Sequence, residues 1–320
     1  MHGSVYLARK VGLAAGTVFV AITLNFILFR AAPGDAVSNL SRVPHASPQL
    51  KEALRHEFGL DQSKWAQYLL YLKELAHGNL GISFADQQPV SHDLATALGN
   101  TVPMVLLGTV IAILFGVFTG TVAAWRRGGI TDQVNTNVAI AFYSVPTQWL
   151  GLMLLILFAG VLPTSGMTDE FAIDPSWWAH LQDVLKHMIL PSATMALTLY
   201  GEYTLIARSA MLETLSEDYI LTARAKGLSN ARIVRRHAFR NALLPTTTMV
   251  ALSLGYVVGG AILIETVFSW PGIGRAVYQA VLQRDYPMLQ GAFLVLTLSV
   301  VVFNLIADLL YFKLDPRVTE

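Results

Sequence analysis

Four arginines within nine residues are the most regularly spaced charged groups in this sequence. They are Arg232, Arg235, Arg236 and Arg240. Spacings of three, four and eight place them on one face of a helix. Such a face binds the phosphates of anionic lipid or the carboxylates of a protein partner. Lipid contact alone would explain the arginines, but it would not explain the small residues Ala223, Ala225 and Gly227 that precede them.

Two short helices joined by a glycine are expected to present these residues. Ser216 can cap a first helix, whose first turn carries two acidic residues that suit the positive helix end. That helix should end at Gly227, which readily adopts the left-handed cap conformation. Ser229 or Asn230 can cap the second helix. Residues 211–243, called the hairpin below, are therefore predicted to offer a surface shaped for close approach by a partner.

No catalytic constellation accompanies the hairpin. The sequence has no G-x-x-x-x-G-K-[ST] loop for nucleotide phosphates and no H-E-x-x-H zinc motif. It has no cysteine, which excludes disulfides, thiol nucleophiles and Cys-ligated metals. The histidines of segment 30–100 fit no standard metal-binding spacing. We therefore expect no ATP hydrolysis, metal or cofactor on this chain itself.

Composition predicts an all-α polytopic membrane protein. Hydrophobic residues make up 54% and charged residues 13% of the chain, with a mean hydropathy of +0.51. Soluble domains carry roughly 25% charged residues, so too little polar surface is available here for a soluble particle. The net charge of +1 gives no field that would attract nucleic acid.

Six stretches are apolar and long enough to cross a bilayer, which takes about 20 residues in a helix. They cover residues 11–29, 101–125, 136–161, 187–207, 244–264 and 288–310. The fourth is weaker because Glu202 interrupts it. The first exceeds the roughly 7–15 apolar residues of a secretion signal, so it is expected to stay as an anchor.

Few ionisable residues fall inside these stretches. Glu202, Glu265 and Asp308 lie toward their ends. Ion-coupled carriers usually place such groups near the membrane midplane. A secondary transporter is therefore kept only as an alternative, and a membrane-bound enzyme as a third class without a recognisable site.

The basic residues predict the orientation. If the N-terminus is cytoplasmic, 13 of the 22 basic residues fall inside. They are Arg9, Lys10, Arg126, Arg127, Arg208, Arg224, Lys226, Arg232, Arg235, Arg236, Arg240, Lys313 and Arg317. This asymmetry places residues 1–10, the hairpin and residues 313–320 in the cytoplasm, and residues 30–100 outside.

The outer segment is expected to contain two helices. Ser47 and Pro48 can begin one over residues 47–56. Apolar side chains at helical spacing predict a second over 62–76, packed on the membrane domain or lying at its interface. These side chains are Trp65, Tyr68, Leu69, Leu72 and Leu75.

Residues 216–245 closely resemble the cytoplasmic loop of binding-protein-dependent ABC permeases, and more narrowly that of the oligopeptide, dipeptide and nickel importers. Further stretches resemble the first permease of that group, so that the match covers nearly the whole chain in order. These stretches are residues 33–35, 58–61, 78–83, 265–274, 284–287 and 315–317.

The resemblance implies a type I ABC importer permease fold with six transmembrane helices, both termini cytoplasmic and a core over 101–312. It implies that the hairpin couples the chain to an ATPase through Asp218, Tyr219, Thr222, Ala223, Arg224, Ala225 and Gly227. It also implies candidate outer gate residues, which are Glu265, Trp270, Pro271, Gly272 and Gly274. The general signature Glu-Ala-Ala-x-x-x-Gly has Leu221 and Thr222 here before Ala223, which puts in doubt a glutamate-based docking contact.

The partners implied are a second homologous permease, two ATPase subunits or domains that carry ATP and magnesium, an external substrate-binding protein and the lipid bilayer of a bacterial inner membrane. The expected activity is peptide import by alternating access. Nickel chelates or glutathione-like peptides are alternative substrates within the same group.

Overall fold

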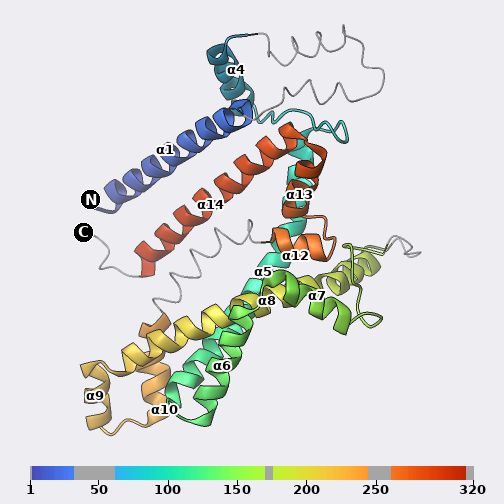
Figure 1. Ribbon diagram of the computed structural model, residues 1–320. Coiled ribbons are helices and arrows are strands. Elements are labelled where there is room, and N and C mark those ends of the chain that lie inside the picture. The colour runs from blue at the N-terminus through green and yellow to red at the C-terminus, as the bar shows by residue number, and fades with distance from the viewer. Residues whose placement is uncertain (1, 32–61, 170–175, 244–260, 315–320) are drawn as a thin grey trace.

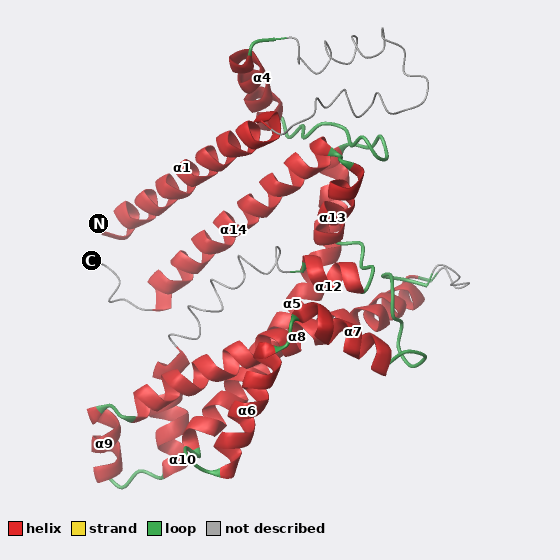
Figure 2. Ribbon diagram, viewed as in Figure 1, coloured by secondary structure: helices red, strands yellow, loops and turns green. Residues whose placement is uncertain are grey.

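The computed structural model describes residues 2–31, 62–169, 176–243 and 261–314, and every regular element within these ranges is a helix. Figure 1 traces the chain, and Figure 2 shows loops and turns joining the helices. The all-α expectation is therefore confirmed for the described residues. The predicted helix at 47–56 and most of the predicted membrane segment 244–264 lie outside them.

One long helix from each end of the chain forms a side-by-side pair. α1 (His2–Ala31) and α14 (Tyr286–Leu314) run in opposite directions, so the start of α1 and the end of α14 lie at the same end of the pair (Figure 1). Lys10 Nζ contacts Asp308 Oδ2 at 2.8 Å. Farther along, Asn25 Nδ2 donates to the carbonyl of Gln290 at 2.9 Å. The charge of Asp308 therefore has a partner on the first helix.

α5 (Val90–Trp125) and α8 (Trp177–Leu215) form the central pair. Small buried residues recur at every fourth position of α5. They are Gly108, Ala112, Gly116, Gly120 and Ala124. A Cβ atom at Gly120 would lie 2.3 Å from the Thr204 carbonyl oxygen, and one at Gly116 would lie 2.7 Å from Tyr203 Cβ. The backbones therefore approach as closely as small residues permit between membrane helices.

The membrane segment predicted over 136–161 is bent and is not a single straight helix. α6 (Ile130–Ser144) and α7 (Thr147–Leu157) meet at an angle of 102° across Val145 and Pro146. Proline lacks the N–H that would continue the helix, and it pushes the residue before it into an extended conformation. Val145 adopts that conformation, with φ −78° and ψ 126°. The apolar stretch is thus a broken span or a re-entrant loop.

Two other helices extend beyond their apolar stretches. α5 begins 11 residues before position 101, and α8 covers 177–215 where 187–207 was predicted. The hydroxyl of Ser176 accepts the Ala179 N–H and caps α8. Three described helices are long and apolar enough to span a membrane, or four if the bent pair is one span. The number six stays a prediction.

α4 (Lys64–Ala76) matches the helix predicted over 62–76, and it packs on α1. The Phe26 and Tyr68 ring centroids are 5.2 Å apart, and the Tyr68 and Thr23 hydroxyls share a hydrogen bond of 2.7 Å. Trp65 and Leu69 are exposed on α4. The helix therefore keeps apolar side chains on two faces, as expected for an element at a membrane interface.

The predicted orientation can be tested by cysteine labelling, because the chain has no native cysteine. Gln87 and Asn230 are both exposed. Gln87 lies in the loop between α4 and α5, Asn230 begins α10 (Asn230–Arg232), and α4 and α10 lie at opposite ends of the structure (Figure 1). We expect Gln87→Cys to react with an impermeant maleimide added outside intact cells. Asn230→Cys should react only after the membrane is permeabilised. The reverse pattern would contradict the orientation.

Candidate functional site

The first arm of the hairpin is a short helix that ends in a glycine cap. α9 (Asp218–Ala225) is followed by Gly227 with φ +73°. The Gly227 N–H donates to the Arg224 carbonyl at 2.9 Å, and the Leu228 N–H donates to the Ala223 carbonyl at 3.3 Å. This pair of bonds defines a Schellman cap, which needs a left-handed residue at the position of Gly227. The predicted left-handed cap at Gly227 is therefore confirmed.

The hairpin differs from the prediction in its caps and in its second arm. Ser216 lies at the C-terminal end of α8, and Glu217 occupies the N-cap position of α9 without a side-chain bond. Ser229 precedes α10 (Asn230–Arg232), again without a side-chain cap. A π-helical segment, η1 (Ile233–Ala238), follows. The four arginines nevertheless all remain exposed, so the basic surface is present.

Ala223 lies inside the hairpin rather than on its surface. It is 6% exposed and belongs to an apolar cluster, called the hairpin cluster, that joins both arms to the ends of α5 and α8. Its buried members are Ala124, Ala210, Met211, Ile220, Ala223, Ile233, Ala238 and Ala242. The expectation that Ala223 meets a partner is therefore wrong, because its side chain is buried among other residues of the same chain.

The remaining hairpin candidates stay on the surface. They are Asp218, Tyr219, Thr222, Arg224, Ala225 and Gly227. Asn241 Nδ2 donates to the Tyr219 hydroxyl at 2.7 Å, which ties α9 to the chain after η1. The Thr222 hydroxyl donates to the Asp218 carbonyl of its own helix. Only Ala225 and Gly227 therefore remain as exposed small residues of the predicted patch.

Glu265 is a fully buried helix cap. It lies in α12 (Ile262–Val267), just before α13 (Ile273–Gln283). Its carboxylate accepts the Thr101 hydroxyl at 2.6 Å and the Arg275 N–H at 3.0 Å. Thr101 in turn accepts the Ile273 N–H at 2.9 Å. The first N–H groups of α13 are thereby satisfied by acceptors on α5 and α12.

The other gate candidates pack around this cap. Trp270 is fully buried, and its Nε1 donates to the Asn100 carbonyl at 3.0 Å. A Cβ atom at Gly272 would lie 2.2 Å from Glu265 Oε1, and one at Gly274 would lie 2.4 Å from Ile262 Cα. Both glycines are therefore required by close approach. Together with Pro271, whose carbonyl accepts from Asn100 Nδ2 at 2.9 Å, they form a tight turn against α5.

A second buried carboxylate fastens the loop that precedes α5. Asp285, 1% exposed, lies between α13 and α14. Its Oδ2 accepts the Ser83 hydroxyl at 2.5 Å and the N–H groups of Phe84 and Ala85 at 3.0 and 3.2 Å. Its Oδ1 accepts the Met288 N–H at 3.1 Å. Two stretches that the resemblance matched separately, 78–83 and 284–287, thus meet at one carboxylate.

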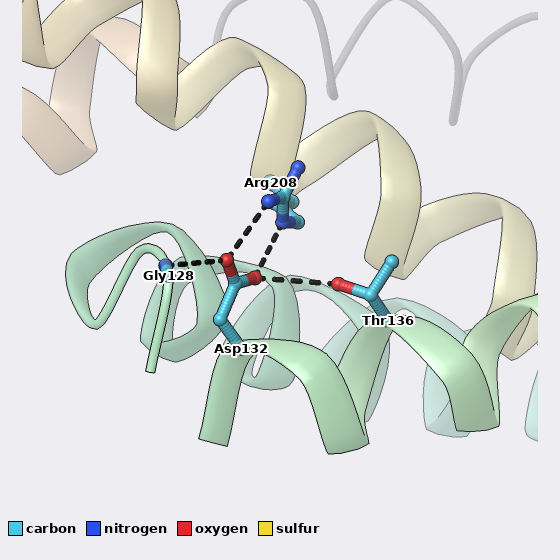
Figure 3. Close-up of polar contacts among 4 residues, drawn as sticks. All are labelled: Gly128, Asp132, Thr136 and Arg208. Carbon is cyan, nitrogen blue, oxygen red and sulfur yellow. Dashed lines mark hydrogen bonds and ion pairs between the residues drawn. The ribbon is translucent and has the colours of Figure 1, made fainter. Parts of the chain in front are cut away.

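An ion pair joins α6 to α8 next to the hairpin (Figure 3). Arg208 Nε and Nη2 donate to the two oxygens of Asp132 at 2.7 and 2.9 Å. The same carboxylate accepts the Gly128 N–H at 3.0 Å and the Thr136 hydroxyl at 3.3 Å. Asp132 is 5% exposed. The contacts to Gly128 and Thr136 are local, whereas the two from Arg208 cross 76 residues of chain and no sequence spacing predicted them.

These arrangements bind and position, and they assemble no reaction centre. The buried carboxylates Asp132, Glu265 and Asp285 each have their oxygens engaged by donors of the chain. Among the described residues, no group of three or more His, Cys, Asp or Glu residues could hold a metal ion. The structure thus presents an exposed basic surface at the hairpin, and buried hydrogen bonds and an ion pair that hold helices and loops together elsewhere.

Comparisons with known proteins agree with this arrangement. Residues 112–320 match the family described as binding-protein-dependent transport system inner membrane component. The chain is 39% identical to the di/tripeptide transport system permease protein DppB of Pseudomonas aeruginosa, over 98% of each chain. It is 37% identical to the dipeptide transport system permease protein DppB of Escherichia coli K12, again over 98% of each.

A relative named for another substrate also matches along its length. The glutathione transport system permease protein GsiC of Escherichia coli K12 is 34% identical, over 98% of this chain and 97% of the relative. Among solved structures, a chain of the MetNI methionine ABC transporter in inward-facing conformations aligns with a TM-score of 0.55. That alignment covers 69% of this chain and 96% of the other at 17% identity, which shows a shared fold.

Proposed function

The chain belongs to the family of binding-protein-dependent transport system inner membrane components, and from that membership we propose that it is a permease subunit of an ATP-driven peptide importer. The observation that carries the proposal is the 39% identity to a di/tripeptide permease over 98% of both chains. The shared fold with a chain of the MetNI transporter supports the importer architecture.

The hairpin is the proposed contact with the ATPase subunits. It presents exposed arginines beside two exposed small residues, Ala225 and Gly227, and its arms are anchored on α5 and α8 by the hairpin cluster. A surface of this kind can transmit a push from a partner to the membrane helices. A second permease, two ATPase subunits with their ATP and magnesium, an external binding protein and the inner membrane of a bacterium complete the proposed complex.

Reconstitution tests the function. The chain, its partner permease and the ATPase subunits in proteoliposomes should take up radiolabelled dipeptide when loaded binding protein is outside and ATP is inside. ATPase subunits with the phosphate-loop lysine replaced should abolish uptake. Uptake that persists without ATP on an imposed proton or sodium gradient would instead support the secondary transporter.

Glutathione import is the second candidate, because a glutathione permease is 34% identical over nearly the full chain. Competition in the same proteoliposomes separates the two. Excess unlabelled dipeptide or tripeptide should reduce the uptake of the radiolabelled dipeptide. Excess glutathione should reduce it only if the chain belongs to a glutathione importer.

Substitutions at the exposed small residues should disconnect the ATPase subunits. Gly227→Val places a β-branched residue at φ +73°, which costs about 1–3 kcal/mol of strain and redirects the second arm. Ala225→Glu places a bulky charge on the exposed patch. We expect either variant to lower peptide uptake at least about tenfold, equivalent to 1.4 kcal/mol, while the chain still inserts in the membrane.

Two matched variants control for strain and for substitution as such. Gly78 also has a positive φ, +74°, and open space around its Cβ, but it follows α4, which lies at the other end of the molecule from α9 (Figure 1). Gly78→Val should therefore keep the ATPase subunits bound, and so should Ala225→Ser. Normal uptake by Gly227→Val and Ala225→Glu would make the hairpin a lipid-facing support.

A further inference from the structure

The ion pair between Asp132 and Arg208 stands at the junction between the hairpin and the helices that lead away from it. Arg208 lies on α8 within three residues of Ala210 and Met211, which belong to the hairpin cluster. The pair is thus within one helical turn of the surface on which both hairpin arms pack. Any displacement of the hairpin reaches Arg208 through the end of α8.

α6 contributes no buried residue to the hairpin cluster, whose members come from α5, α8 and the hairpin. Its first turn is held by Asp132 instead. The Asp132 carboxylate accepts hydrogen bonds from Arg208 of α8, from the Gly128 N–H in the turn after α5 and from Thr136 of α6 itself (Figure 3). The Asp132 side chain therefore joins the start of α6 to α8 and to the turn after α5.

α6 leads from this junction toward the Glu265 cap. A Cβ atom at Gly201 of α8 would lie 2.3 Å from the Ala139 carbonyl of α6, so the two helices touch backbone to backbone. After the bend at Pro146, Leu154 and Phe158 of the α7 region pack on the apolar cluster that contains Ile264 and Phe268 beside Glu265. The helices from the hairpin to that cap form an unbroken series of packed contacts.

We propose that Asp132 and Arg208 are positioning residues that lock α6 to the hairpin-bearing ends of α5 and α8, so that α6 and α7 follow the hairpin during the transport cycle. This inference rests on the proposed function. The bidentate geometry matters because two parallel bonds fix orientation as well as distance, which a single contact does not. With the pair broken, α6 keeps its contact with α8 at Gly201, but its first turn is no longer tied to the hairpin-bearing end of α8, so α6 follows the hairpin less closely.

The expected signature is uncoupling, not loss of the complex. In proteoliposomes containing the whole importer and loaded binding protein, the measured quantity is the number of ATP molecules hydrolysed for each peptide imported. Asp132→Asn should raise this ratio by about tenfold, within the 5–150-fold range usual for coupling between distant sites. Basal ATP hydrolysis and the subunit ratio of the purified complex should stay at the wild-type values.

Charge reversal provides the rescue arm. The double variant Asp132→Arg with Arg208→Asp restores an ion pair and should bring the ratio back toward that of the wild type, whereas each single reversal should not. Asp308→Asn is the matched control, because Asp308 forms an ion pair with Lys10 that joins α1 to α14 and involves neither α6 nor α8. Its ratio should equal that of the wild type.

The distance between two spin labels separates a positioning role of the ion pair from a role in stability alone, because a loss of stability alone would not change that distance. Lys226 of the hairpin and Gln133 of α6 are exposed, and the chain has no cysteine to interfere. With labels at both positions, the wild-type distance distribution should be narrow and the same with and without ATP, since the two elements move together. In Asp132→Asn it should broaden and depend on the nucleotide.

Arg208→Lys keeps the charge but loses the bidentate geometry, so it remains informative if Asp132→Asn fails to assemble. Its ratio should lie between those of the wild type and Asp132→Asn. An unchanged ratio with an unchanged distance distribution, in whichever of these variants assembles, would overturn the proposal. A wild-type complex that imports no peptide would instead refute the proposed function.

Discussion

Replacing Gly120 with valine is expected to lower strongly the amount of folded protein in the membrane. The new Cβ atom would lie 2.3 Å from the Thr204 carbonyl oxygen and 3.0 Å from the Arg208 nitrogen, both of them backbone atoms. No side chain can rotate away to relieve the clash, so α5 and α8 must separate. Overpacking costs about 1–3 kcal/mol in typical cores, and a backbone clash belongs at the upper end or beyond.

The same helix supplies the control for this prediction. Gly99 also lies in α5, yet a Cβ atom there would meet nothing within 4 Å. Gly99→Val therefore introduces the same residue into the same helix without the clash. Yield of monodisperse protein in detergent and the midpoint of thermal unfolding measure both variants. Equal midpoints for Gly120→Val and Gly99→Val would show that the two helices do not depend on this close approach.

Asp285→Ala should free the loop that precedes α5. Removing the carboxylate leaves the buried Ser83 hydroxyl and the Phe84 N–H without this acceptor, and it leaves the Ala85 N–H with only Ser83 Oγ. An unsatisfied buried donor costs about 1–3 kcal/mol. We expect amide exchange of the peptide spanning 79–89 to become at least about tenfold faster, which corresponds to 1.4 kcal/mol of easier opening.

Asp86→Ala is the matched control in the same loop. Asp86 is exposed, and its carboxylate accepts the Gln88 N–H. Its loss should change the exchange of this peptide by less than about threefold, because exposed substitutions usually stay within 0.5 kcal/mol. If Asp285→Ala and Asp86→Ala exchange alike, Asp285 does not hold the loop.

Features carried by neighbouring residues were predictable from the sequence. Gly227 follows an eight-residue helix and is the only residue type that takes the left-handed cap without strain, so its role could be inferred locally. The helices around residues 11–29 and 288–310 were visible as unbroken apolar stretches, and the stripe of α4 as a helical period. Each of these signals lies within a few turns of chain.

The sequence did contain a signal for the break at Pro146, but the length of the apolar stretch led to the prediction of a single segment. Proline cannot continue a helix, yet the residues on both sides are apolar enough to count as one segment. Apolar length also marks where lipid begins rather than where a helix ends, which is why α5 and α8 extend past their predicted bounds. The burial of Ala223 depended on how both arms pack, which the helical spacing alone did not determine.

Long-range polar partners could not be predicted at all. Thr101 and Glu265 are 164 residues apart, Ser83 and Asp285 are 202 apart, and Asp132 and Arg208 are 76 apart. Each residue alone is an ordinary polar group near the end of an apolar stretch. Only the packing of distant helices turns them into a cap, a fastening and an ion pair.

The close pairing of α5 with α8 also imposes a delay during synthesis of the protein, because α5 is made well before α8. Thr119 and its partner Thr204 are 85 residues apart in the chain. At roughly 5–20 residues per second, a ribosome needs about 4–17 s to make that stretch. For that time the glycine face of α5 has no partner from its own chain. The insertion machinery of the membrane must shelter this face, so defects there should be met first by quality-control proteases, before any subunit is assembled.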